Sequence, residues 1–269
     1  MLVAYPFVMA IYLSMTSRSF SGPASFIWFA NYWELLQDDL FRQTVRNSFV
    51  FTGVSVAVKT VLGLVLAVAL NRTLRLHRMI RGAVLLPWVV PTALSTLGWW
   101  WMFDSLYSVI NWVLVHGGFV DKGYQWLGTP HLAMAAVIAV NIWRGLPFFA
   151  ILTLAGLVAI PKELYEAAEV DGAGPLARFF LVTLPLLRPV LLVVILFSTI
   201  FTFSDFNIVY VLTRGGPMNS THLFATLAHN IGLAGGKLGE GAAISLFMFP
   251  LLALFVFFQL RMIQREQSL

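Results

Sequence analysis

Residues 49–70 read FVFTGVSVAVKTVLGLVLAVAL, an apolar run whose one charged residue is Lys59. A helix that crosses the hydrocarbon core of a bilayer needs about 20 such residues, so this stretch predicts a membrane-spanning helix. The composition agrees, because 59% of the 269 residues are hydrophobic, only 11% are charged and none is cysteine. Soluble domains carry roughly 25% charged residues, so a soluble enzyme, a disordered chain and a disulfide scaffold are excluded. The sequence predicts an all-α integral membrane protein.

Five further apolar segments bring the prediction to about six transmembrane helices in one domain over residues 1–269. They are Leu2–Thr16, Ala83–Phe103, Leu132–Ile160, Val190–Thr213 and Ala242–Leu260. The first is short, but it has no basic region and no small-residue cleavage site, so we interpret it as a span and not as a signal peptide. The stretch Tyr107–Phe119 is too short to cross, and we expect an interfacial helix there, with a re-entrant segment as the alternative.

Arginines set the predicted orientation of the chain. The loop between the second and third predicted spans holds four of them and no acid, and loops rich in positive charge face the cytoplasm. Alternation then places residues 161–189 and both chain termini on the cytoplasmic side. The net charge of +5 is too diffuse to indicate a nucleic-acid partner. The four arginines are Arg72, Arg75, Arg78 and Arg81.

The predicted cytoplasmic segment Ile160–Pro175 has the pattern of a short helix, a glycine turn and a second helix. Pro161 suits the first position of a helix, Gly172 and Gly174 end it, and Pro175 can start the next one, before Pro185 and Pro189 lead into the fifth span. Acids recur every three residues and form a stripe beside a narrow apolar one. The segment is either a solvated loop or a docking surface for a cytosolic partner that supplies basic residues. The acids are Glu163, Glu166 and Glu169, and the apolar residues are Leu164, Ala167 and Ala168.

Charged residues inside the predicted spans are costly, at roughly 2.5–3.5 kcal/mol each on insertion scales, so they call for a partner or a cavity. Arg144 and Asp205 have opposite signs and lie on consecutive spans. They could form a salt bridge, or one or both could line a pathway. For Lys59 we favour a structural role, with its ammonium at the membrane surface or bonded to a backbone carbonyl.

Polar and aromatic residues on the fifth predicted span lie at a spacing that suits a binding surface. Ser198, Phe201, Thr202 and Asp205 recur at a spacing that places them on one face of a helix. A sugar site needs hydroxyl partners and aromatic faces, although a phenylalanine equally serves plain packing. Trp99–Trp101 indicate an interfacial belt, with a sugar-stacking platform as the weaker alternative.

Two kinds of site are not expected in this chain. The five histidines lack the spacing that metal sites require, so we predict no metal. The sequence Gly235-Gly-Lys-Leu lacks the first glycine and the serine or threonine of a phosphate-binding loop. We therefore predict that the chain does not bind ATP itself.

Several motifs together resemble the permeases of ABC importers. Glu166-Ala-Ala, Gly172 and Val182-Thr-Leu-Pro match the signature E-A-A-x3-G-x9-I-x-L-P of these permeases, with valine in place of isoleucine. From about Tyr5 to Arg261 the chain also resembles the maltose-type carbohydrate permeases. The matching segments are 29–33 (FANYW), 46–52 (RNSFVFT), 85–88 (LLPW), 141–148 (NIWRGLPF) and 210–217 (YVLTRGGP). The Gly-Gly-Pro sequence is typical of the first of the two permeases in such importers.

The resemblance implies a type I importer permease fold with a cytoplasmic coupling helix in the loop of residues 161–188. The implied function is a non-enzymatic, multi-pass subunit of the cell inner membrane that imports a carbohydrate, such as a disaccharide. A sugar alcohol or glycerol phosphate is the alternative substrate. An ion-coupled transporter is less favoured, because it calls for inverted repeats and more intramembrane carboxylates.

The resemblance also implies partners and site residues. The partners are a second, different permease, two ATPase subunits that bind ATP and Mg²⁺, an extracytoplasmic sugar-binding protein, the sugar and membrane lipid. The substrate residues are Arg144, Gly145, Phe148, Ser198, Phe201, Thr202 and Asp205. The ATPase-coupling residues are Glu163, Glu166, Ala167, Ala168, Asp171 and Gly172, where Gly172 permits the sharp turn. Gly215, Gly216 and Pro217 contact the binding protein, with a simple connecting turn as the alternative.

Overall fold

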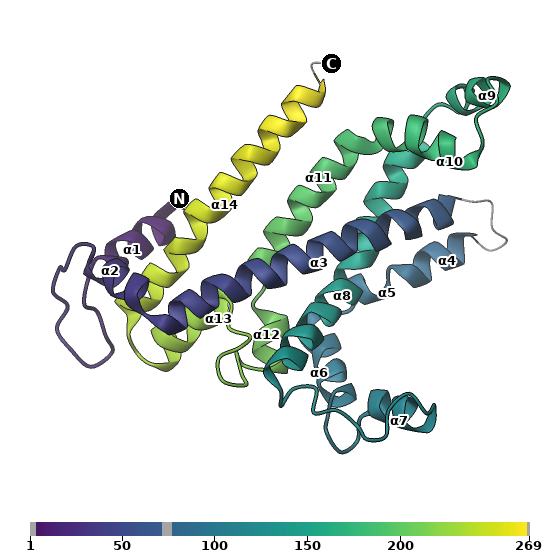
Figure 1. Cartoon of the computed structure of the whole chain (residues 1–269). Coiled ribbons are helices and arrows are strands. Elements are labelled where there is room, and N and C mark those ends of the chain that lie inside the picture. Colours follow the sequence, from purple (N-terminus) through teal and green to yellow (C-terminus); the bar gives the residue numbers. More distant parts are fainter. Residues whose placement is uncertain (1–3, 72–76, 268–269) are drawn as a thin grey trace. The chain divides into compact units, whose positions relative to one another are not determined.

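The computed structural model describes residues 4–71 and 77–267, most of which lie in helices (Figure 1). Within these ranges no strand forms beyond a single bridge between Thr16 and Phe26, which confirms the predicted all-α class. The first eight elements are α1 Ala4–Ser14, α2 Ala30–Gln37, α3 Asp39–Asn71, α4 His77–Val84, α5 Leu86–Val89, α6 Thr92–Met102, α7 Val109–His116 and α8 Pro130–Val158. The others are α9 Lys162–Val170, α10 Pro175–Arg178, η1 Phe179–Thr183, α11 Leu184–Phe203, α12 Asn207–Leu212, α13 Phe224–His229, η2 Asn230–Ala234 and α14 Leu238–Gln267.

Four helical stretches of the described chain are long and apolar enough to cross a membrane. They have 27 to 38 residues, more than the roughly 20 that a span requires. Four of the six predicted spans lie along these stretches and are confirmed as long apolar helices. Arg72 and Arg75, on which the predicted orientation depends, lie outside the described residues. The four stretches are Asp39–Asn71, Pro130–Val158, Pro175–Leu212 and Leu238–Gln264.

Two predicted spans are not single long helices. The first contains only α1, whose 11 described residues are too short to cross. The third, Ala83–Phe103, is divided among α4, α5 and α6. Val90 is extended, with φ −66° and ψ 132°, because the ring of Pro91 disfavours a helical residue before it. The prediction of one continuous helix there is therefore wrong.

The contacts of the chain group into two compact units. Unit 1 comprises Met1–Thr52, Thr92–Val140 and Thr202–Leu254. Unit 2 comprises Gly53–Pro91, Asn141–Phe201 and Phe255–Leu269. The helices α3, α8, α11 and α14 each contribute residues to both units. The single domain over residues 1–269 stays a prediction beside this division.

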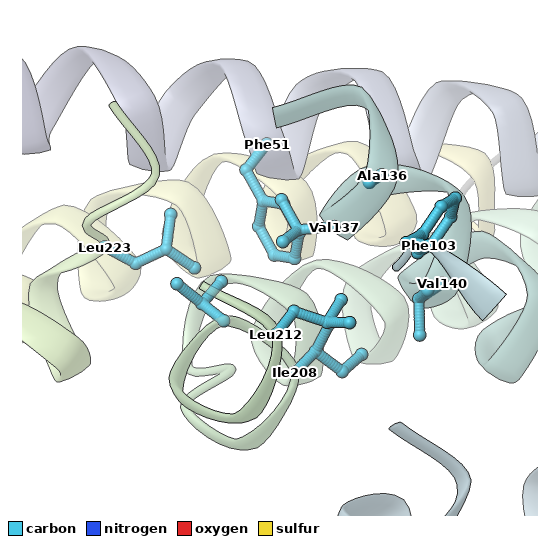
Figure 2. Packing of buried hydrophobic residues seen from close by; sticks show 9 residues of the cluster. Phe51, Phe103, Ala136, Val137, Val140, Ile208, Leu212 and Leu223 are labelled. Carbon is cyan, nitrogen blue, oxygen red and sulfur yellow. The ribbon is translucent and has the colours of Figure 1, made fainter. Parts of the chain in front are cut away.

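Unit 1 is held together by two apolar clusters. In the first, Phe51 of α3 and Val137 of α8 are fully buried against Ile208 of α12, and α12 packs beside α6 (Figure 2). In the second, Phe224 and Leu227 of α13 are fully buried among side chains of α2, α3 and α14. The segment 214–241, between the fifth and sixth predicted spans, thus contributes helix α13 to the core of this unit.

Unit 2 packs α3, α8 and α11 closely, and glycines permit the approach. Phe149 of α8 and Leu187 of α11 are fully buried in one cluster. The ring of Phe149 lies over Gly63 of α3, and Leu187 lies over Gly156 of α8. Membrane helices gain most of their association energy from such close packing, because lipid is as apolar as their side chains.

The contact between Gly63 and Phe149 predicts a loss of stability on substitution. A Cβ at position 63 would lie 2.5 Å from Cδ1 of Phe149, so Gly63→Ala forces the ring or the helix to move. We expect the free energy of unfolding to fall by about 1–3 kcal/mol, as in other overpacked cores. Thermal unfolding in detergent measures the change.

Gly53→Ala on the same helix is the matched control. No atom lies within 4 Å of a Cβ at this position. We expect Gly53→Ala to leave the unfolding temperature unchanged or raise it, because alanine favours a helix over glycine by roughly 0.5–1 kcal/mol. Equal unfolding temperatures for both variants and the natural chain would contradict the close packing at Gly63.

Candidate functional site

The segment after α8 forms the predicted helix, turn and second helix, which we name the acidic hairpin (α9, residues 171–174 and α10; Figure 1). Pro161 precedes the first helical residue and does not occupy it, one position earlier than predicted. Gly172 has a φ of +82°, a conformation that glycine adopts without steric cost. The N–H of Ala173 donates to the carbonyl of Ala168 over 2.8 Å and closes the end of α9. Pro175 starts α10, as predicted.

Two side-chain contacts brace the acidic hairpin from within. The hydroxyls of Tyr165 and Thr183 are hydrogen-bonded at 3.1 Å. Nη1 of Arg178 lies 2.8 Å from Oε2 of Glu169, an ion pair that is open to solvent on the Glu169 side. Glu169 therefore ties α9 to α10 and is not simply a member of a free acidic stripe.

The surface of the acidic hairpin combines carboxylates with apolar side chains. Five of the six predicted coupling residues are exposed, and Ala168 is half-buried. Sequence reasoning missed Val170 and Leu176, whose side chains are 89% and 75% exposed. The sequence did contain a signal for this apolar surface, because Val170 and Leu176 are large apolar residues in an otherwise hydrophilic segment. The exposed predicted residues are Glu163, Glu166, Ala167, Asp171 and Gly172.

The acidic hairpin continues directly into the next long helix. The π-helical turn η1 joins α10 to α11, and Pro185 and Pro189 lie inside α11 and not before it as we expected. Pro185 has no N–H to donate, and the helical hydrogen bonding changes to the π pattern in η1 immediately before it. A continuous helical backbone thereby joins the acidic hairpin to α11.

Lys59 is buried in unit 2, with only 3% of its surface exposed. Its Nζ donates to Oδ1 of Asn141 over 2.9 Å, so a side-chain amide takes the place of the expected backbone carbonyl. Gly145, a predicted substrate residue, makes room for this lysine, because a Cβ there would lie 2.8 Å from Cδ of Lys59. The contact links α3 to α8 and agrees with the structural role that we favoured.

Three aromatic rings and one cation form a cluster in unit 2. Trp88 stacks on Phe148 with ring centroids 4.6 Å apart, and Phe201 lies edge-on to Phe148 at 6.0 Å. The guanidinium of Arg144 lies over Trp88, 5.1 Å from the ring centroid. Nε of Arg144 is buried and makes no hydrogen bond within the described part of the chain. Sequence reasoning selected three of these residues but missed Trp88, which the quoted segment 85–88 contains.

The residues predicted to line a binding surface near α11 differ in how far they are exposed to solvent. Ser198 and Thr202 are 5% and 1% exposed, so their hydroxyls are not open to a ligand in the isolated chain. Phe201 between them is 53% exposed. Asp205 lies in the break between α11 and α12, and its Oδ1 accepts a hydrogen bond of 3.0 Å from the N–H of Ile208. Residues 204–206 thus interrupt the helix within this long apolar stretch, and the four predicted residues differ in their exposure.

The predicted Gly-Gly-Pro contact lies in a tightly bonded loop of unit 1. Oγ1 of Thr221 donates to the carbonyl of Gly216 at 2.7 Å, so the loop is more than a simple connection. Gly215 is buried against the imidazole of His222, while Gly216 and Pro217 are half-buried. The exposed tip of the loop consists of Arg214, Met218 and Asn219.

The glycine-rich stretch before α14 contains a lysine that pairs with an acid in the first turn of that helix. Nζ of Lys237 pairs with Oε2 of Glu240 at 2.8 Å, and this hydrogen bond raises the pKa of Lys237. Within residues 4–71 and 77–267, no three His, Asp or Glu side chains gather closely enough to hold a metal ion. The absence of metal and of ATP from this chain stays a prediction.

Comparison with known proteins identifies similar chains. The family model "Binding-protein-dependent transport system inner membrane component" matches residues 59–268. The sulfoquinovosyl glycerol transport permease of Agrobacterium fabrum is 38% identical over 253 residues, which cover 93% of this chain and 82% of that protein. The trehalose/maltose transport permease of Thermococcus litoralis is 40% identical over 236 residues, with coverage of 88% and 79%. A chain of a bacterial alginate ABC transporter, solved in complex with an alginate pentasaccharide-bound periplasmic protein, matches with a TM-score of 0.84 at 21% identity, over 98% of this chain and 89% of that one.

Burial of His222 predicts a loss of stability in acid. Desolvation lowers the pKa of His222 below its usual 6.5, so the fold favours the neutral imidazole. Its stabilising effect is complete above pH 6.5 and is lost as the pH falls through that value towards the lower pKa of the folded state. We expect the unfolding temperature to fall more between roughly pH 7.5 and pH 5 for the natural chain than for His222→Gln. The control His116→Gln, at an exposed histidine, retains the full pH dependence of the unfolding temperature. If His222→Gln had the same pH profile as the natural chain, His222 would not be the group responsible.

Proposed function

The chain belongs to the family of binding-protein-dependent transport system inner membrane components, and from this premise we propose that it is the permease subunit of an ABC importer for a carbohydrate. The observation that carries the proposal is the acidic hairpin, an exposed and internally braced pair of helices joined at Gly172. The relatives support the substrate class, because two of them are named for transport of trehalose or maltose and of sulfoquinovosyl glycerol.

In the proposed mechanism, cytosolic ATPase subunits clasp the acidic hairpin. The carboxylate of Glu166 suits a cleft with basic side chains, because charge-assisted hydrogen bonds are stronger than neutral ones. Val170 and Leu176 add apolar area that a partner can bury. Because α10 continues through η1 into α11, closure of the ATPase pair moves the membrane-spanning helix. The chain itself then needs no site for ATP or Mg²⁺.

The proposed orientation places the acidic hairpin and both chain termini in the cytoplasm of a cell with this protein in its inner membrane. The arginine-rich segment after α3 supports it, since such segments stay on the cytoplasmic side. Nη2 of Arg81 donates to the carbonyl of Leu70 over 3.1 Å. A cation at the C-terminal end of a helix is also favoured by the helix dipole.

The proposed sugar path includes the aromatic cluster of Trp88, Phe148 and Phe201. The flat C–H face of a sugar ring packs on aromatic rings, and a guanidinium such as that of Arg144 donates to hydroxyl groups. Phe201 is the most exposed of the three rings, so a sugar can reach it. Gly145 serves this site indirectly, because its lack of a side chain leaves room for Lys59.

The proposed assembly has further partners on the other side of the membrane. A second permease completes the pathway, and an extracytoplasmic sugar-binding protein delivers the substrate. We assign contact with the binding protein to the exposed tip Arg214, Met218 and Asn219, supported from below by Gly215, Gly216 and Pro217. The tip is held in a defined conformation, because Nδ2 of Asn47 donates to the carbonyl of Asn219 at 3.3 Å.

Substitutions in the acidic hairpin test the coupling role. We expect Glu166→Lys to reverse the charge at the ATPase contact and Gly172→Pro to prevent the φ of +82° that the turn requires. Both variants insert into the membrane, but sugar uptake and co-purification of the ATPase fall at least about tenfold, as for loss of a desolvated charged contact. Lys162→Gln, an exposed change on the same helix, is the control and keeps both activities. Normal uptake by both hairpin variants would show that the ATPase does not bind here.

The aromatic cluster generates a second test. Phe201→Ala removes an exposed ring, and we expect the KM for sugar uptake to rise about tenfold, because a stacking contact is worth roughly 0.5–1.5 kcal/mol beyond the area it buries. Co-purification with the ATPase stays unchanged, since the acidic hairpin is intact. Phe255→Ala on α14, which removes a ring of 39% exposure, is the control. Equal KM values for both variants would remove the cluster from the sugar path.

A further inference from the structure

A pocket separate from the aromatic cluster lies in unit 1, on the segment between α6 and α8. It has a volume of about 290 Å³ and is lined by Trp100, Asp104, Ser105, Gln125, Trp126 and Gly128, among others. None of these residues belongs to the aromatic cluster or to the acidic hairpin. We infer that this pocket binds one ring of a neutral sugar on the extracytoplasmic side of the membrane. The inference rests on the proposed function and orientation.

The polar side of the pocket is an ionised carboxylate with an unused oxygen. Oδ1 of Asp104 accepts hydrogen bonds from the N–H groups of Leu106 at 2.8 Å and Tyr107 at 2.9 Å. These bonds, that from Tyr107 first, lower the pKa of Asp104. Oδ2 has no hydrogen-bond partner within the part of the chain that the structure describes. It can accept from the hydroxyls of a sugar and repels an anionic ligand.

Further polar groups of the pocket come from the other end of the segment. The side chain of Gln125 lies against Gly128, where a Cβ would be 3.2 Å from Oε1. Its amide can both donate and accept, as a sugar hydroxyl requires. The hydroxyl of Ser105 is exposed at the same pocket. Donors and acceptors of both kinds at one small site favour a polyhydroxyl ligand over an apolar one.

The aromatic side of the pocket has two tryptophan rings: that of Trp100 is exposed, and that of Trp126 is held by packing. The side chain of Trp100 is 47% exposed, which leaves a face open for stacking. Trp126 is half-buried and packs on Phe103, with ring centroids 5.8 Å apart. Ligand pockets usually measure about 300–1,000 Å³, so a volume at the lower limit suits a single sugar ring and not a long oligosaccharide.

The pocket is preorganised, although it lies on a connecting segment. Oδ1 of Asn111 accepts from the N–H of Tyr124 at 3.0 Å and from Nε1 of Trp126 at 2.9 Å, and its Nδ2 donates to the carbonyl of Tyr124 at 2.9 Å. Oγ of Ser108 caps α7 by accepting from the N–H of Asn111 at 3.1 Å and donates to the carbonyl of Met102 at 2.7 Å. Such bracing lowers the ordering cost of binding.

Binding of methyl α-D-glucopyranoside to the full chain in lipid nanodiscs, followed by saturation-transfer difference NMR, tests the inference. Phe201→Ala serves as the background, so that the aromatic cluster does not contribute. We expect this background to retain saturable binding, and added Trp100→Ala to weaken it about tenfold through loss of the stacking face. Added Asp104→Asn weakens it severalfold, because a charged acceptor is replaced by a neutral one. The matched control is Trp101→Ala, an exposed tryptophan outside the pocket, which leaves binding unchanged.

Three outcomes would overturn the inference. The first is loss of all binding in Phe201→Ala alone, which would mean a single site. The second is equal binding by the Trp100→Ala and Trp101→Ala chains. The third is weaker association of the sugar-binding protein with Trp100→Ala while glucoside binding is unchanged, which would make the pocket a protein contact. Co-purification with the ATPase separates these results from a failure of the proposed function, since it depends on the acidic hairpin alone.

Discussion

The rest of the structure depends on the requirement that a chain in hydrocarbon satisfies its backbone hydrogen bonds internally. Long helices meet this requirement wherever the sequence is unbroken, as in α3 and α8. Where a helix breaks, a polar side chain can form a hydrogen bond with a backbone group that has lost its helical partner. The carboxylate of Asp205 accepts from the N–H of Ile208 between α11 and α12.

Charges inside the helices follow the same logic, because each is costly without a partner. Lys59 bonds to the amide of Asn141, and Arg144 lies over Trp88. The ring of Trp88 carries no net charge, so this contact does not neutralise Arg144 as a carboxylate would. This leaves Arg144 with an electropositive edge beside an aromatic cluster, an arrangement that suits polar ligands.

The acidic hairpin shows how local sequence rules, together with two side-chain contacts, define a braced pair of helices. Glycine at position 172, with its positive φ, and proline at position 175 determine where one helix ends and the next begins. The ion pair of Glu169 with Arg178 and the bond between Tyr165 and Thr183 then hold the two helices together. Because η1 joins this braced pair to α11, the hairpin can move as one body with the membrane helix.

The sequence by itself determined the membrane class, four long helices and the acidic hairpin, because hydropathy and glycine–proline punctuation act over neighbouring residues. It also identified Arg144 and Phe148 as unusual. Only the tertiary structure decided the burial of Ser198 and Thr202 and the partner of Lys59. The sequence offered a sugar-stacking platform at Trp99–Trp101 only as an alternative, and the pocket beside Trp100 emerged from the structure, since it joins residues about 25 positions apart through the bonds of Asn111. Burial and partner choice depend on residues distant in sequence, which periodicity along one helix does not encode.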